Sequence, residues 1–200
     1  MIDEPPIKKI LEERFPNFKI IYKKEYYEIY IKKDEIFETI KKIKEDPELC
    51  YDQLTDLTAV DYPSREERFE LIYLFLSMTL NSRIVIKSSI KIEDKIESIS
   101  SLYKSANWFE RECYDLLGIY FLNHPDLRRI MTDYNFEGHP LRKDFPLTGH
   151  NEVRYDDLEK KVVYEPVQLN QEFRNFDYMS PWEGFENELI GDEKSKDKDS

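Results

Sequence analysis

The hydrophobic pattern of this 200-residue chain changes at Gly118, and this change constrains its fold more than any other feature. Before Gly118, apolar residues recur with the periods of helices and strands. After it, prolines at positions 125, 140, 146, 166 and 181 interrupt a stretch with no sustained period. We therefore expect an α+β globular domain over 1–118, an extended partner-binding arm over 119–184 and a disordered acidic tail over 185–200.

The first domain reads as a small mixed or antiparallel sheet covered by helices. Apolar residues at helical spacing predict helices, and alternation of apolar and polar residues predicts strands. The expected elements, in chain order, are a helix from Ile7 that stops before Pro16, a hairpin of strands 18–22 and 26–31, a helix capped by Asp34 that ends before Pro47, a strand over 52–63, a central strand over 68–80, an Asn81-Ser82 turn and an antiparallel strand over 83–90.

Two further helices are expected before the pattern changes. The first is a weak one over 93–103. The second has Asn107 as its N-cap, Glu110 three residues later as the partner in a capping box, and Gly118 as its C-terminal stop. In the arm, VVY from position 162 and VQL from position 167 could form short strands.

Charge and cysteine content exclude several classes of protein. A formal net charge of −12 and a pI near 4.9 argue against a nucleic-acid binder, which needs a local excess of Lys and Arg. The two cysteines, Cys50 and Cys113, cannot supply four thiolates for an iron–sulfur cluster or a Cys-rich zinc site. They also form no disulfide framework, which fits a reducing compartment.

Neither targeting nor membrane-spanning segments are expected. The start MIDEPPIKK lacks the apolar run of a signal peptide and the Arg-rich character of a transit peptide, so we expect the protein to stay where it is made. The longest uncharged run, LIYLFLSMTLNS from Leu71, is about half of the roughly 20 residues that a membrane span needs. Any membrane association is therefore expected to be peripheral.

A charged triplet, Glu110, Arg111 and Glu112, interrupts an otherwise apolar and aromatic helix. On one interpretation Arg111 pairs with Asp115 one turn later on a solvated face. On the other, Glu110 and Arg111 belong to partly buried ion pairs that fix a register against another chain, a role that suits the planar fork of arginine. From the spacing alone we favour the first interpretation, a pair on a solvated face.

The chain carries no convincing catalytic, cofactor-binding or metal-binding motif. The spacing of His124 and His139 with the acids between them matches no HExxH, CxxC or EF-hand frame. A Cys113–His124 nucleophile pair lacks an oxyanion loop and an orienting acid. GxGxxG, GxxxxGK[ST] and GxSxG are all absent. A stand-alone metal or thiol enzyme built on Cys113, His124 and His139 is kept as the alternative.

The arm holds more aromatic rings than a solvated linker would. They are Tyr134, Phe136, Phe145, Tyr155, Tyr164, Phe173, Phe176, Tyr178 and Trp182. The same segment carries the cations Arg128, Arg129, Arg142, Lys143, Arg154 and Arg174. Arginine among aromatic rings is typical of protein interfaces, so we expect a partner protein to bury these rings. A general scaffold for some other complex is a further alternative.

From ANWFERECYDLLGIYFLNHPDLRRIM onward the chain resembles the family of the 30 kDa (C-type) subunit of respiratory complex I, the proton-pumping NADH:quinone oxidoreductase. The signature of that family runs through Glu110-Arg111-Glu112, Asp115, Leu116-Leu117, His124, Arg128 and Ile130-Met131, and every position is met. DYNFEGHPLRKDFPLTG, VVYEPVQLNQEFRNFDYMSPWEG and LTDLTAVDYPSREERFELIYLFLS extend the resemblance to about residues 50–184. Cys113 and His150 depart from the family pattern, which weakens any thiol or His150 mechanism.

The resemblance implies a cofactor-free core subunit of the peripheral arm of the complex. Its partners would be the large 49 kDa (D-type) subunit and the cluster-bearing B-type subunit, with FMN and iron–sulfur clusters on partner subunits. Its place would be the cytoplasmic face of a bacterial inner membrane, or the matrix side in a mitochondrion. The signature and interface residues expected on this chain are Glu110, Arg111, Glu112, Asp115, His124, Arg128, Arg129, His139, Arg142, Lys143, Asp144, Arg174 and Trp182.

Overall fold

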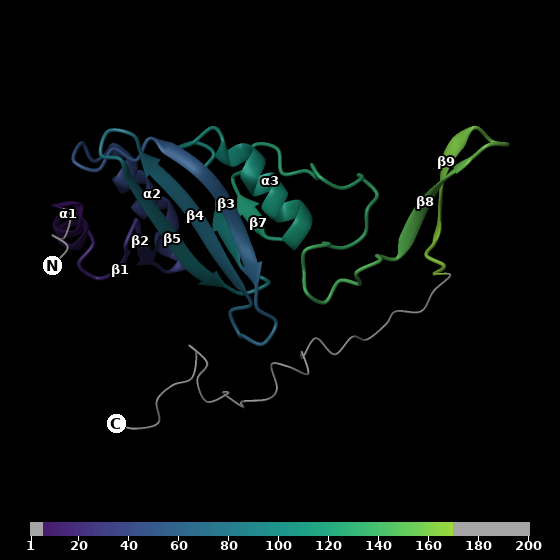
Figure 1. Ribbon diagram of the computed structural model, residues 1–200, viewed down its shortest axis with the longest axis horizontal. Helices are drawn as coiled ribbons and strands as arrows, with labels where there is room; N and C mark the ends of the chain where they lie inside the picture. Colours follow the sequence, from purple (N-terminus) through teal and green to yellow (C-terminus); the bar gives the residue numbers. More distant parts are fainter. Residues whose placement is uncertain (1–5, 170–200) are drawn as a thin grey trace, which may run out of the picture. The chain divides into compact units, whose positions relative to one another are not determined.

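A computed structural model describes residues 6–169, and the chain divides into two compact units, residues 1–150 and 151–200. The helices and strands of the first unit are shown in Figure 1. In chain order they are α1 (Pro6–Arg14), β1 (Lys19–Lys23), β2 (Tyr26–Tyr30), the 3-10 helix η1 (Lys33–Glu35), α2 (Ile36–Glu45), β3 (Gln53–Asp61), β4 (Phe69–Ser77), β5 (Ser82–Ile90), β6 (Lys95–Glu97), α3 (Ala106–Leu117) and β7 (Tyr120–Leu122).

Five strands form one mixed sheet in the order β1-β2-β5-β4-β3. β2 and β5 run parallel, and the other neighbouring pairs are antiparallel, so the expected mixed sheet is confirmed. The middle position belongs to β5, and β4, the expected central strand, lies between β5 and β3. The turn before β5 follows the prediction, because Asn81 adopts a positive φ of 47°.

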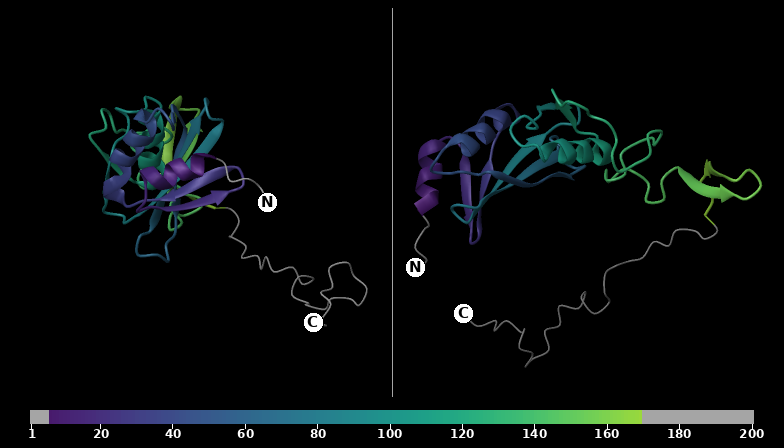
Figure 2. Two further views of the ribbon diagram at one scale, coloured as in Figure 1. Left: turned by 90° about the vertical axis from the view of Figure 1, so that its left-hand side faces the viewer. Right: turned by 90° about the horizontal axis from the view of Figure 1, so that it is seen from above.

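The core lies between one face of the sheet and the helices α2 and α3, which Figure 2 shows on the same side of the sheet. Inward residues of β4, from Phe69 to Phe75, alternate with half-buried ones and are at most 1% exposed. Ile36, Ile40 and Ile43 form the fully buried stripe of α2 that the sequence predicts. Burying each such side chain contributes about 1.5–3 kcal/mol to folding.

The helix expected over 93–103 is wrong. Lys95–Glu97 forms β6, which pairs in parallel with β7 beyond α3. This pairing joins Ile96 to Phe121, two residues that are each 1% exposed. Because the partner strand lies about 25 residues downstream, local periodicity could not reveal it.

Two smaller expectations also fail. Asp34 lies inside η1, and Glu35 is the residue that precedes α2 as its N-cap. In the second unit, β8 (Asn151–Asp156) and β9 (Lys161–Pro166) form an antiparallel hairpin that includes VVY, whereas VQL from position 167 is not a strand. None of the helices within residues 6–169 is long and apolar enough to cross a membrane.

Candidate functional site

The carboxylate of Asp115 organises the segment that follows β7. Asp115 is fully buried and accepts hydrogen bonds from three consecutive backbone N–H groups, at 2.9, 2.7 and 2.9 Å from Ile130, Met131 and Thr132. The Thr132 hydroxyl donates at 2.5 Å and Arg129 Nη1 at 2.7 Å. Burial alone would raise the pKa of Asp115, but these bonds outweigh it and hold the pKa well below its usual range.

The Arg111 side chain binds backbone carbonyls of the same segment. The prediction that Arg111 pairs with Asp115 is wrong. Arg111 Nε donates to the carbonyl of Arg128 and its Nη2 to the carbonyl of Arg129, both at 3.1 Å. The guanidinium also lies 5.6 Å from the ring centre of Trp108, which is 63% exposed. Asp115 pairs instead with Arg129, because a fully buried carboxylate needs a partner that reaches it from outside the helix.

The C-terminus of α3 is completed by side chains and backbone from residues 139–142. The last four carbonyls of a helix have no partner within the helix. Here the carbonyl of Asp115 accepts from His139 Nδ1 at 2.8 Å, that of Leu116 from Leu141 N at 3.0 Å, and that of Leu117 from Arg142 Nε at 2.7 Å. The positive charge of Arg142 also suits the negative end of the helix dipole.

Gly118 makes this approach possible. It ends α3 with a positive φ of 76°, as the sequence predicts. A Cβ at this position would lie only 2.3 Å from Arg142 Nη2 and 2.6 Å from His139 Nε2. Gly118 therefore serves both as the helix stop and as the space into which these two side chains fit.

Glu110 takes no part in a capping box, so that expectation is wrong. The N-cap of α3 is Ser105, and the Glu110 carboxylate is fully buried. It accepts from Ser98 Oγ at 2.6 Å and from Ile99 N at 2.8 Å, and His124 Nε2 lies 3.8 Å away. Burial raises the pKa of Glu110 to about 7 against the opposing effect of the two hydrogen bonds.

A third buried carboxylate, Asp61 at the end of β3, fixes residues 143–144. Arg68 binds Asp61 with both ends of its guanidinium fork, at 2.6 and 2.8 Å, and donates to Asp144 at 2.9 Å. The backbone N–H of Lys143 donates to Asp61 at 2.7 Å. Sequence reasoning missed Asp61 and Arg68, since no local pattern links them to Lys143 and Asp144, which lie 82 and 76 positions downstream of them.

The side chains of two further predicted site residues, Glu112 and Arg128, are exposed. Glu112 is exposed on α3, and Arg128 forms an exposed ion pair with Asp126 at 2.9 Å. Arg174 and Trp182 lie outside the described residues.

The alternative enzyme site finds little support in the geometry. The Cys113 thiol is buried and donates to the carbonyl of Leu57 at 3.5 Å, and burial raises its pKa, the opposite of an activated nucleophile. His124 and His139 bind the backbone carbonyls of Asn107 and Asp115. Within residues 6–169, no three His, Cys, Asp or Glu side chains are placed to hold a metal ion.

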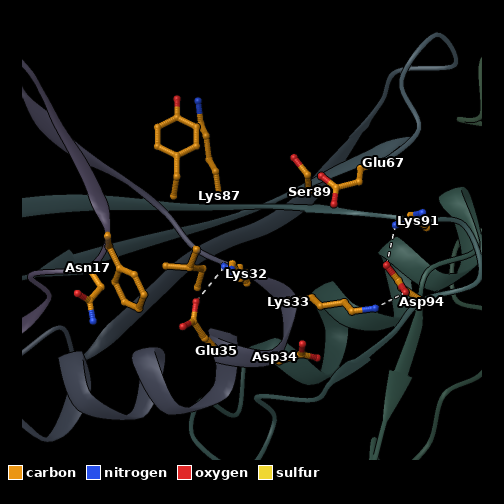
Figure 3. Close-up of a pocket in the computed structure, with 13 residues that line it drawn as sticks. Asn17, Lys32, Lys33, Asp34, Glu35, Glu67, Lys87, Ser89, Lys91 and Asp94 are labelled. Carbon is orange, nitrogen blue, oxygen red and sulfur yellow. Dashed lines mark hydrogen bonds and ion pairs between the residues drawn. The ribbon is translucent and has the colours of Figure 1, made fainter.

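A cavity of about 590 Å³ lies elsewhere, between η1 and the ends of β2 and β5 (Figure 3). Among its lining groups, Lys33 Nζ lies 2.5 Å from Asp94, and the backbone N–H of Lys91 donates to Asp94 at 2.8 Å. None of the residues that line it is a predicted site residue.

The β8–β9 hairpin presents one apolar face to solvent. Its register places Val153 opposite Tyr164 and Tyr155 opposite Val162. Side chains directly opposite one another lie on the same face of a two-stranded ribbon, and these four are between 56% and 64% exposed. The other face carries Glu152 and Glu165, with Arg154, Val163, Asp156 and Lys161.

Comparisons with known proteins identify the family of this chain. Residues 29–151 match the family model "Respiratory-chain NADH dehydrogenase, 30 Kd subunit". The C-type subunit of the NADH-quinone oxidoreductase of Hyphomonas neptunium is 54% identical over 165 residues, which covers 82% of each chain. That of Parvibaculum lavamentivorans is 57% identical over 161 residues, 80% of each chain, and that of Chelativorans sp. is 50% identical over 190 residues, 95% of this chain and 94% of the relative.

A solved structure shares the fold. A chain of the membrane-bound sulfane sulfur reductase, an archaeal respiratory membrane complex, superposes with a TM-score of 0.61 at 24% identity, over 70% of this chain and 84% of that one. At this level of identity the likeness concerns the fold alone. The family match and the curated relatives together show that the chain belongs to the family of the 30 kDa, C-type subunit of NADH-quinone oxidoreductase, respiratory complex I.

Proposed function

We propose that this chain is the cofactor-free core subunit that binds the large 49 kDa (D-type) subunit of complex I and lies near the cluster-bearing B-type subunit. In this role it supports electron transfer from NADH, through FMN and iron–sulfur clusters on its partners, to quinone. Its place is the cytoplasmic face of a bacterial inner membrane, held there through the complex, or the matrix side in a mitochondrion. Catalysis belongs to the assembly.

The exposed apolar face of the β8–β9 hairpin is the observation that carries the proposal. A two-stranded hairpin is at best marginally stable in water, and it needs a third strand or another surface against its apolar face. Leu158 at the turn is 96% exposed, and Val153, Tyr155, Val162 and Tyr164 are all more than half exposed. A partner protein that covers this face would bury Tyr155 and Tyr164, a residue type enriched at interface centres, together with the apolar side chains beside them.

Adjacent valines on opposite faces of β9 provide a matched test. Val162 belongs to the apolar face, and Val163 pairs with Arg154 on the charged face. We expect Val162→Glu to reduce recovery of the D-type subunit with the tagged chain by at least about tenfold, since burying an unpaired charge costs several kcal/mol. Val163→Glu should leave recovery within about twofold, because this carboxylate would stay in water beside Arg154.

The readouts are the amount of D-type and B-type subunits that copurify from solubilised membranes, and NADH:quinone activity of those membranes. Both should fall together in Val162→Glu. Equal recovery of the partner subunits with the two variants would show that the apolar face is not the docking surface.

A further inference from the structure

We propose that Glu110 and His124 form a buried pair of titratable groups that makes the attachment of residues 123–128 to α3 depend on pH. Both side chains are fully buried, and His124 Nε2 lies 3.8 Å from Glu110 Oε2. His124 stands where the chain leaves β7 for the segment bound by Arg111 and Asp115. The pair therefore lies at the start of that segment and goes beyond the proposed docking role.

The hydrogen bonds of His124 fix its tautomer. Nδ1 accepts from the backbone N–H of Asp126 at 3.1 Å, so the ring proton is on Nε2 and is donated to the carbonyl of Asn107 at 3.1 Å. A second proton, on Nδ1, would break the hydrogen bond from Asp126. Only attraction between the charged ring and Glu110 would offset the free-energy cost of losing that bond. Protonation of His124 therefore removes the hydrogen bond that holds residues 124–126 in this conformation.

Glu110, in contrast, is favoured in its protonated, neutral form. Its carboxylate faces the His124 ring from α3, Glu97 lies nearby on β6, and the Tyr73 hydroxyl of β4 and the Cys113 thiol of α3 are close enough to interact electrostatically. Arg111 and Asp126 act on His124. Among the described residues, no cation other than a protonated His124 contacts the Glu110 carboxylate. The closed form, in which residues 123–128 are attached to α3, therefore favours a neutral Glu110.

The two groups give opposite pH dependences. Burial raises the pKa of Glu110 from 4.5 to about 7, so the closed form loses stability as pH rises through this range. Burial lowers the pKa of His124 below 6.5, so the closed form gains stability as pH rises toward 6.5. In the wild type the two effects act in opposite directions, and removing one group leaves only the pH dependence of the other.

Amide hydrogen exchange of the full-length chain between pH 5 and pH 7, corrected for intrinsic rates, tests the pair. The amides of Ile99 and Asp126 are the reporters, because they donate to Glu110 and His124. In His124→Gln the opening constant at Ile99 should rise roughly tenfold or more over this range. In Glu110→Gln the opening constant at Asp126 should fall, and Glu112→Gln, on the exposed side of the same helix, should match the wild type.

The proposal is overturned if Glu110→Gln and His124→Gln keep the wild-type pH profile, or if Glu112→Gln changes it equally. Ser98→Ala provides a test that keeps both titratable groups. It removes a hydrogen bond that lowers the pKa of Glu110, so the pH at which protection of Ile99 falls should move upward. An unchanged or lowered midpoint in Ser98→Ala would contradict the pair even if the other variants failed to fold.

Discussion

Asp115 shows how one buried carboxylate can order a segment that has no helix or strand. Its oxygens accept from three successive N–H groups, a hydroxyl and a guanidinium. Each of these donors would otherwise need water or another acceptor. An Asn in its place keeps the shape, loses the charge that pairs with Arg129, and presents its own N–H groups to surrounding donors.

We expect Asp115→Asn to lower the free energy of unfolding by about 3 kcal/mol or more at pH 7, measured by urea denaturation. The matched control is Asp126→Asn, which breaks an exposed pair with Arg128 and should cost under about 1 kcal/mol. Similar losses in the two variants would contradict a special role for Asp115.

Asp115→Asn should also change how the free energy of unfolding depends on pH. The pKa of Asp115 in the folded state is below its ordinary value of 3.8, so its contribution is present above pH 3.8 and is lost as pH falls further. The stability difference between the wild type and Asp115→Asn should therefore shrink below about pH 4. A difference that stays constant down to pH 3 would show that the carboxylate charge does not matter.

At the level of elements, the sequence predicted what depends on neighbours along the chain. The α2 stripe, the Asn81 turn and the Gly118 stop follow from local spacing and backbone preference, and all three are present. The β6–β7 pairing and the Asp61–Lys143 bond join distant residues, and they could not be read from local patterns.

In the candidate site, too, the sequence predicted some features and missed others. The residues of the signature were found, and the structure brings Asp115, Arg129, His139 and Arg142 together at the end of α3. Only Asp115 had a predicted partner, Arg111, which was inferred from i to i+4 spacing on the assumption that this face of the helix is solvated. Because Asp115 is fully buried, contacts from outside the helix replaced the local pair.

The close approach at the end of α3 can be tested with two glycines. Gly118 and Gly149 both have positive φ, 76° and 70°, so an alanine at either site costs about 1–2 kcal/mol in backbone strain. Gly118→Ala additionally places a methyl group against Arg142 and His139 and should cost clearly more. Thermal unfolding of both variants measures the difference, and equal shifts in Tm would show that the contacts yield without cost.

At the level of the whole molecule, the chain contains two contrasting segments, residues 119–150 and the β8–β9 hairpin. Residues 119–150 contain little regular structure, yet buried carboxylates at Asp61 and Asp115 hold their backbone in place. The β8–β9 hairpin has regular backbone pairing, yet its apolar side chains are exposed. Regular hydrogen bonding is therefore a poor guide to which part of this chain is self-sufficient, and the burial of side chains is a better one.

Limited trypsin digestion should reveal this contrast. In the wild-type chain we expect cleavage after Lys160, in the exposed hairpin turn, to precede cleavage after Arg129, whose side chain is held by Asp115. In Asp115→Asn, cleavage after Arg129 should accelerate by roughly tenfold or more, because about 3 kcal/mol of local stability is lost. Cleavage after Lys160 should keep its rate and serves as the internal control. If Arg129 is cut equally fast in both proteins, as judged by mass spectrometry of the fragments, Asp115 does not hold this segment.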